Sequence, residues 1–223
     1  MNGPDSDQST AADTTEQETD VGAESGPMNP GKPGPDTTAR LAAMKRALGD
    51  AERVIVLTHD NPDPDAIASA AGLGHLLRKA VGLPVTLAFG GIVGRAENRA
   101  LLEELDVPFE RAEDLEFPST AAVALVDTQP RAGNNSLPPG QIATIVIDHH
   151  PVRAESSAAA YSDVRPEYGA CASMMVVFLR ALKLDPDRQL ATALFYAIQS
   201  ETMDLGRESS KAEVDASLFL YPR

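Results

Sequence analysis

The chain of 223 residues has no tryptophan, a single cysteine and no long apolar segment. One cysteine, Cys171, excludes an internal disulfide framework and is typical of a protein from a reducing compartment. No apolar run approaches the roughly 18 to 20 residues that are needed to cross a membrane. The acidic N-terminus also lacks the basic and then apolar regions of a signal peptide. These absences predict a cytoplasmic protein with no membrane partner.

Positive charge is also scarce, because 19 Lys and Arg residues stand against 33 Asp and Glu, for a formal net charge of -14. Residues 1 to 40 hold eight acids against Lys32 and Arg40, a net of -6, which leaves -8 for the remainder. Such a surface repels long duplex nucleic acid, which proteins bind through many Lys and Arg contacts to phosphates. A small anionic substrate is compatible with this charge if bound metal ions supply local positive charge.

The composition changes near residue 37. Residues 1 to 37 are rich in Asp, Glu, Thr, Gly and Pro and have no aromatic residue. They therefore cannot bury enough apolar surface to offset the entropy that is lost on ordering. We predict an acidic disordered tail over residues 1–37 and a single domain over residues 38–223, since the chain is too short for two domains of ordinary size.

Beyond residue 37, helical periodicity alternates with short apolar runs. Helices are predicted over residues 38–49, 66–81, 95–105, 169–184, 187–201 and 211–221, and strands over 53–57, 84–89, 121–126, 143–147 and, as an edge strand, 158–161. The apolar runs show no alternation, which is typical of strands that are buried on both faces of a parallel sheet. The predicted fold class is α/β, a three-layer domain with a mainly parallel sheet flanked by helices and followed by C-terminal helices.

Side chains that can bind metal follow three of the predicted strands. They are His59, Asp63 and Asp65 after the first strand, Asp127 after the third, and Asp148, His149 and His150 after the fourth. The carboxyl ends of parallel strands meet at the edge of the sheet where open α/β proteins bind ligands. Imidazoles and carboxylates without a thiolate favour a divalent cation of intermediate hardness. For the first segment, the alternative is an acidic turn in which Asp65 caps the following helix.

Four segments in this order resemble the successive motifs of the DHH phosphoesterase superfamily. They are His59-x-Asn61-Pro62-Asp63-x-Asp65-Ala66, Val126-Asp127, Asp148-His149-His150 and Ala197-Ile198-Gln199-Ser200-Glu201-Thr202. The resemblance covers residues 53 to about 210. The superfamily includes RecJ-type exonucleases, oligoribonuclease and nucleotide phosphatases, cyclic-dinucleotide phosphodiesterases and family II pyrophosphatases. The chain most resembles the branch that acts on very short oligonucleotides and nucleotide bisphosphates.

The resemblance implies a hydrolase with two divalent metal ions at the carboxyl edge of the sheet. It implies that His59 and Asp63 bind one ion, that Asp65 and His149 bind the other, and that Asp127 bridges the two. Mixed imidazole and carboxylate ligands favour Mn2+, with Co2+, Mg2+ or Zn2+ as alternatives. Two such ions can activate a water molecule and clamp the phosphate for in-line displacement.

The fourth motif and the second histidine of the third motif have separate implied roles. Glu201 stands where the family usually has Asp, so Glu201 is the predicted metal ligand, with Asp204 or a solvated helix end as the alternatives. His150 is implied to contact the phosphate or the leaving group. Asp148 is implied to orient a ligand imidazole.

The resemblance also implies a second domain with a glycine-rich motif, and the 223 residues contain no such segment. We therefore expect a DHH catalytic domain that lacks the substrate-binding domain, and either a homodimer or a partner that supplies it. Expected substrates are short oligonucleotides, cyclic dinucleotides and nucleotide bisphosphates. The alternatives are an inorganic pyrophosphatase or polyphosphatase and a nucleotide-binding module without turnover. Arg131, Asn134 and Asn135 either contact substrate or form a plain turn.

Overall fold

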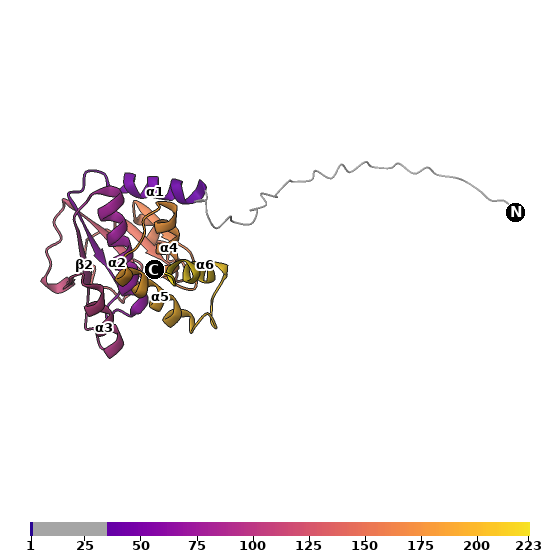
Figure 1. The fold of residues 1–223 in the computed structure, drawn as a ribbon. Helices are drawn as coiled ribbons and strands as arrows, with labels where there is room; N and C mark the ends of the chain where they lie inside the picture. The colour runs from indigo at the N-terminus through magenta and orange to yellow at the C-terminus, as the bar shows by residue number, and fades with distance from the viewer. Residues whose placement is uncertain (2–34) are drawn as a thin grey trace.

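The structure is a computed structural model that describes Met1 and residues 35–223, so nearly all of the predicted tail lies outside the described residues. At its centre is a six-stranded sheet of order β3-β2-β1-β4-β5-β6, in which every neighbouring pair is parallel. Figure 1 shows the sheet with helices packed against it. The strands are β1 (Arg53–Leu57), β2 (Val85–Phe89), β3 (Phe109–Arg111), β4 (Ala121–Val126), β5 (Ile145–Asp148) and β6 (Tyr161–Val164). The predicted parallel α/β fold is confirmed.

The strand order changes direction between β1 and β4. The chain first runs outward from β1 to β3, and then returns to β4 on the other side of β1 and runs outward to β6. Leu57 pairs with Leu125, and Val126 pairs with Ile147, so the central strands end level with one another. The crevice outside such a switch point is where open α/β sheets bind their ligands.

All six α-helices of residues 35–223 contribute to one buried core on one face of the sheet. They are α1 (Pro35–Leu48), α2 (Pro64–Leu76), α3 (Ala96–Leu105), α4 (Cys171–Ala181), α5 (Arg188–Thr202) and α6 (Lys211–Leu220). Right-handed crossovers place α2 and α3 on this face, and α4 to α6 cover its second half after β6. The apolar side chains of Val54, Val56 and Ile147 point into this core.

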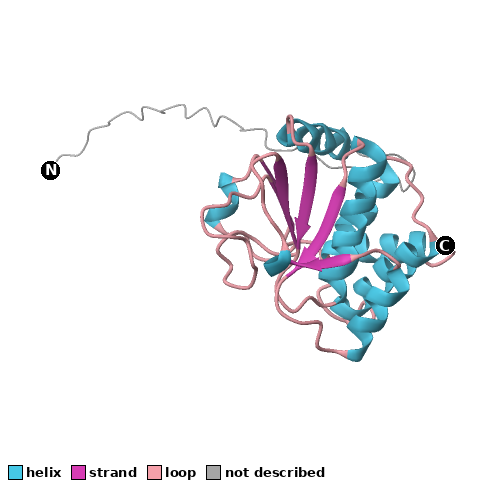
Figure 2. Cartoon of the chain, turned by 90° about the vertical axis from the view of Figure 1, so that its left-hand side faces the viewer, coloured by secondary structure: helices cyan, strands magenta, loops and turns pink. Residues whose placement is uncertain are grey.

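The opposite face of the sheet is covered differently. Ile55, Leu57 and Val146 form a smaller core there, which is packed by Leu115 and Phe117 of the connection between β3 and β4. The third layer therefore consists of connections and short 3-10 helices rather than α-helices, as Figure 2 shows. The longest of these connections, residues 127–144, contains Pro130, Pro138, Pro139 and two glycines, which disfavour an α-helix.

Several predicted boundaries move in the structure. The first helix begins at Pro35 rather than Thr38, and the predicted helix over residues 66–81 is α2 followed by a π-helical turn that ends at Gly82 (φ 83°). Asp65 is not a helix cap, because the cap of α2 is Asp63, whose Oδ1 accepts a hydrogen bond from the backbone N–H of Ala66 at 3.0 Å. The predicted edge strand lies three residues later, as β6, and β3 was not predicted. No helix in the described part of the chain is long and apolar enough to span a membrane.

Candidate metal centre

Asp127 lies at the centre of the site, immediately after the fully buried strand β4. Its backbone has φ 58°, in the left-handed region that few non-glycine residues adopt, and its N–H donates to the Ile147 carbonyl at 2.9 Å. The side chain is 2% exposed, and its Oδ1 has no hydrogen-bond partner among the described residues. A buried carboxylate oxygen without a donor is costly, so this atom is poised for a cation.

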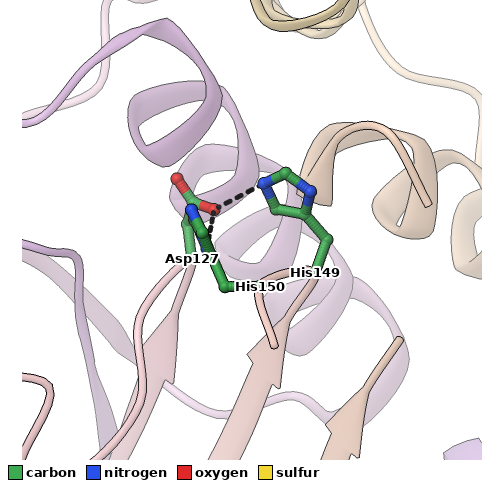
Figure 3. A group of neighbouring side chains, drawn as sticks. All are labelled: Asp127, His149 and His150. Atoms are coloured by element: carbon green, nitrogen blue, oxygen red, sulfur yellow. Dashed lines mark ion pairs between the residues drawn. The ribbon is translucent and has the colours of Figure 1, made fainter. Parts of the chain in front are cut away.

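Three imidazoles surround the Asp127 carboxylate. Its Oδ2 lies 3.6 Å from Nε2 of His59, and its Oδ1 lies 3.4 Å from Nε2 of His149 and 3.8 Å from Nδ1 of His150. Figure 3 shows the last two contacts as dashed lines. The separations exceed an ordinary hydrogen bond, but they fit two atoms that each lie about 2.0–2.2 Å from one ion.

The described residues contain two groups of potential ligand atoms that lie within 4.8 Å of one another. One group is His59, Asp63 and Asp127, and the other is Asp127, His149 and His150. Asp127 belongs to both groups, which is the position that the sequence predicts for a bridging ligand. Asp65 lies next to the second group, with its Oδ2 at 3.6 Å from Nε2 of His149.

Backbone carbonyls fix the orientation of two of the rings. Nδ1 of His59 lies 3.0 Å from the Asp60 carbonyl, and Nδ1 of His149 lies 3.2 Å from the Tyr168 carbonyl. A carbonyl only accepts, so in the neutral form of each ring Nδ1 carries the proton and Nε2 keeps its lone pair. The two Nε2 atoms face the carboxylates. The tautomer with the proton on Nδ1 and the lone pair on Nε2 is the one that metal binding needs.

Asp65 is held by the N-terminus of α4. Its Oδ2 accepts from the backbone N–H of Cys171 at 2.7 Å, and its Oδ1 accepts from the N–H of Ala172 at 2.8 Å. Burial raises the pKa of Asp65 to about 6, because the helix N-terminus and His149 only partly compensate the lost hydration. No signal in the sequence indicates this contact, since the partners are more than 100 residues apart.

Asp148 orients His150 rather than a ring of the metal-binding pair. Its Oδ1 accepts from Nδ1 of His150 at 2.8 Å and from the backbone N–H of His149 at 2.9 Å. The bond from Asp148 raises the pKa of His150, and burial opposes it. Unlike the other two rings, His150 faces Asp127 with Nδ1, and because Asp148 engages this atom, His150 has no free nitrogen directed at Asp127. Asp148 was predicted to orient a ligand imidazole, and at the ring of His149 this role belongs instead to the Tyr168 carbonyl, which the sequence analysis missed.

The structure does not bring Glu201 or Asp204 into either group of potential ligands. Glu201 lies near the end of α5, with its Oε1 at 3.6 Å from a guanidinium nitrogen of Arg207. Its charge still acts on Asp127, whose pKa is raised well above the ordinary value by burial first, then by Asp65 and more weakly by Glu201. Asp204 is exposed in the turn that follows. A metal-binding role for Glu201 or Asp204 remains a prediction.

Hydrogen bonds from its own side chains hold the loop after Asp127 in shape. Thr128 Oγ1 donates to Asn134 Oδ1 at 2.8 Å, and Asn135 Nδ2 donates to the Gln129 carbonyl at 2.9 Å. The two asparagines therefore shape a turn, as one of the two predictions for them states. Arg131 is exposed, also with a left-handed backbone (φ 58°).

Gly90 allows the loop after β2 to approach the first motif, a contact that the sequence analysis missed. A Cβ atom at Gly90 would lie 1.9 Å from Asp60 Oδ1 and 2.1 Å from Ser136 Oγ, two atoms that are hydrogen-bonded to each other at 2.7 Å. The Gly90 carbonyl also accepts from the N–H of Asn61 at 2.9 Å. The segment that carries His59 is thus packed against β2 without room for a side chain.

We expect Gly90→Ala to displace this segment and to weaken metal binding. Overpacking of this kind costs about 1–3 kcal/mol, which corresponds to a fall in Tm of roughly 2–12 °C. Thermal melting and Mn2+ titration of the purified variant measure both effects. Gly94→Ala is the matched control, because nothing lies within 4 Å of a Cβ at Gly94. Equal behaviour of the two variants would contradict the assigned role of Gly90.

The fold and the site together define a doubly wound α/β protein with a candidate divalent-metal centre at its switch point. Residues 53–198 match the model of the DHH family, N-terminal domain, and the chain belongs to this family. The predicted resemblance to DHH proteins is thereby confirmed.

Two similar proteins extend the comparison. An uncharacterized protein of Methanocaldococcus jannaschii is 41% identical over 170 residues, which are 75% of this chain and 34% of that protein. The chain thus spans about a third of the length of this curated relative. A solved structure of an exopolyphosphatase-related protein from Bacteroides fragilis is similar with a TM-score of 0.56 and 14% identity, over 83% of this chain and 56% of that chain. At this identity the similarity concerns the fold.

Proposed function

We propose that residues 38–223 are the catalytic domain of a metal-dependent phosphoesterase that hydrolyses short oligonucleotides, cyclic dinucleotides or nucleotide bisphosphates. The observation that carries the proposal is the buried Asp127 carboxylate, which has an unpartnered oxygen and belongs to two groups of potential metal ligands. Membership of the DHH family supports hydrolysis of a phosphate ester. The name of the Bacteroides fragilis protein is compatible with a related reaction.

The residues that surround Asp127 suit two divalent ions. His59 and Asp63 would hold one ion, Asp65 and His149 the other, and Asp127 both, while Glu201 would complete the set from the end of α5. This mixture of imidazoles and carboxylates favours Mn2+ over softer or harder ions. When bound, two such ions lower the pKa of a water molecule and stabilise the charge that develops on the phosphate.

His150 is the group of this chain that we assign to the substrate. Its side chain is 54% exposed, and its Nδ1 is engaged by Asp148, which leaves Nε2 for a ligand. The bond from Asp148, the largest influence, raises the pKa of His150 against the effect of burial. Its Nε2–H would donate a hydrogen bond to a phosphate oxygen, or a proton to the leaving oxygen as the ester bond breaks.

A small substrate panel tests the proposed function. We expect Mn2+-dependent product release from an RNA dinucleotide, a cyclic dinucleotide or adenosine 3′,5′-bisphosphate, and none from an Asp127→Ala control. Phosphate release from pyrophosphate alone would instead assign an inorganic pyrophosphatase. Tight nucleotide binding with no product across the panel would identify a binding module. Either result, turnover of pyrophosphate alone or nucleotide binding without product, would overturn the proposed function.

A further inference from the structure

The side chain of Gln129 connects the two central loops of the site. Gln129 lies two residues after Asp127 and is 2% exposed. Its Nε2 donates to Asp148 Oδ2 at 2.6 Å and to the Pro151 carbonyl at 3.1 Å. Its Oε1 accepts from the Arg153 N–H and from Ser156 Oγ, each at 2.8 Å.

These four bonds use both donors and both lone pairs of the amide. All four partners lie within residues 148–156, in the segment that begins at the end of β5. Gln129 itself lies in the loop after β4. One buried side chain thus ties the loop that carries Asp127 to the segment that carries His149 and His150.

We infer that Gln129 is a positioning residue for His150, acting through the Asp148 carboxylate. Asp148 divides its oxygens: Oδ2 accepts from Gln129, and Oδ1 accepts from Nδ1 of His150. The hydrogen bond from Gln129 to Oδ2 fixes the orientation of the Asp148 carboxylate. This orientation determines where Oδ1 meets Nδ1 of His150. Without the Gln129 donor, Asp148 Oδ2 is left buried and unsatisfied, so rotation of the carboxylate toward another donor becomes favourable.

The other site imidazoles do not depend on Gln129. Nδ1 of His59 is held by the Asp60 carbonyl, and Nδ1 of His149 is held by the Tyr168 carbonyl. Loss of Gln129 is therefore expected to act first on the His150 ring, because His149 contacts Asp148 only through its backbone N–H and its ring is held by Tyr168. A merely structural role would instead disturb all three rings together, because their loops lie at the same edge of the sheet.

The chain has only four histidines, so 15N-histidine labelling gives an NMR spectrum with four imidazoles. The spectra are recorded on the 223-residue chain with Mg2+, and His150→Gln assigns the His150 signals. In Gln129→Leu, we expect the Nδ1–H signal of His150 to shift or to be lost through exchange, while the signals of His59 and His149 stay. Gln141→Leu is the matched control, because Gln141 lies before β5, at the opposite edge of the sheet.

Gln129→Glu separates the two halves of the amide. An ionised glutamate keeps oxygens for the Arg153 N–H and Ser156, but it has no donor for Asp148, so the spectra are recorded above the pKa of the introduced carboxyl. Gln129→Glu should therefore keep the segment of residues 148–156 in place while the His150 ring loses its fixed orientation. Unchanged His150 signals in both variants, or equal changes at His59 and His149, would overturn the inference.

Activity provides a second readout that rests on the proposed function. With a substrate that the panel identifies, we expect kcat to fall about 10- to 100-fold in both Gln129 variants, with Mn2+ affinity within twofold of the wild type. The NMR result does not require turnover. A chain that is inactive on every substrate but shows the selective change at His150 would therefore refute the proposed function and support the role of Gln129.

Discussion

Asp127→Asn is expected to abolish Mn2+-dependent hydrolysis and to leave the metal-free protein at least as stable as the wild type. Asparagine has the same shape, tolerates the left-handed backbone at this position (φ 58°) and removes the charge. Burial, followed by Asp65 and Asp63, raises the pKa of Asp127 well above its ordinary value, so ionisation of this group opposes folding. An ion that relies on Asp127 as a shared ligand loses its bridge in the variant.

We expect turnover to fall by at least about 1000-fold, which corresponds to about 4 kcal/mol of transition-state stabilisation. The number of bound Mn2+ ions, measured by equilibrium dialysis, should also fall. Asp106→Asn is the matched control, because Asp106 also has a left-handed backbone (φ 48°) but is exposed at the end of α3. If Asp127→Asn melted well below the control and still bound Mn2+ fully, Asp127 would be a structural residue and not a ligand.

The architecture could be predicted because its signals are local. β1, β4 and β5 are apolar runs that stop at a polar residue, and a parallel sheet brings such ends to one edge. The placement of His59, Asp127 and the Asp148 segment follows from that rule alone. β3 could not be predicted in the same way, because its three residues, Phe109–Arg111, have no pattern that separates them from a loop.

The support of the site could not be predicted, because it depends on backbone groups from distant segments. The N–H groups of Cys171 and Ala172 that hold Asp65 carry no mark in the sequence, and neither does the Tyr168 carbonyl at His149. Gln129 reads as an ordinary loop residue until the segment after β5 is placed beside it. The sequence therefore predicts which side chains meet but not what fixes their orientation.

The metal-free protein should lose stability as the pH rises from about 4 to 6. Burial is the main cause that raises the pKa of Asp65 to about 6 from 3.8, and it also raises that of Asp127. In this interval the folded state keeps protons that the unfolded state has released, so the free energy of unfolding falls with pH. For Asp65, the difference between a pKa of 3.8 and one of about 6 corresponds to a free energy on the order of 3 kcal/mol, or roughly 6–12 °C in Tm.

The other groups of the site whose pKa is changed affect stability outside this pH interval. Hydrogen bonds outweigh burial at Asp63 and Asp148, whose pKa values lie below 3.8, so their contribution is lost only in stronger acid. At His59 the neighbouring acceptors outweigh burial, and at His150 the bond to Asp148 is the main cause, so both pKa values lie above 6.5 and both contributions are lost at higher pH. Within the site, the interval from pH 4 to 6 therefore reports on Asp65 and Asp127; outside the site, burial lowers the pKa of His75, which acts in the opposite direction below pH 6.5.

Thermal melting across this interval, with and without Mn2+, measures the effect. Because Mn2+ binds the deprotonated carboxylates, its stabilisation should increase over the same interval in which the metal-free protein weakens. Asp65→Asn should flatten the metal-free curve, since the amide has no charge to be buried. A metal-free stability that rises steadily from pH 4 to 6, and is unchanged in slope by Asp65→Asn, would show that these carboxylates ionise without cost. The buried charges of Asp65 and Asp127 would then not destabilise the metal-free protein, and relief of this cost could not favour the binding of a cation.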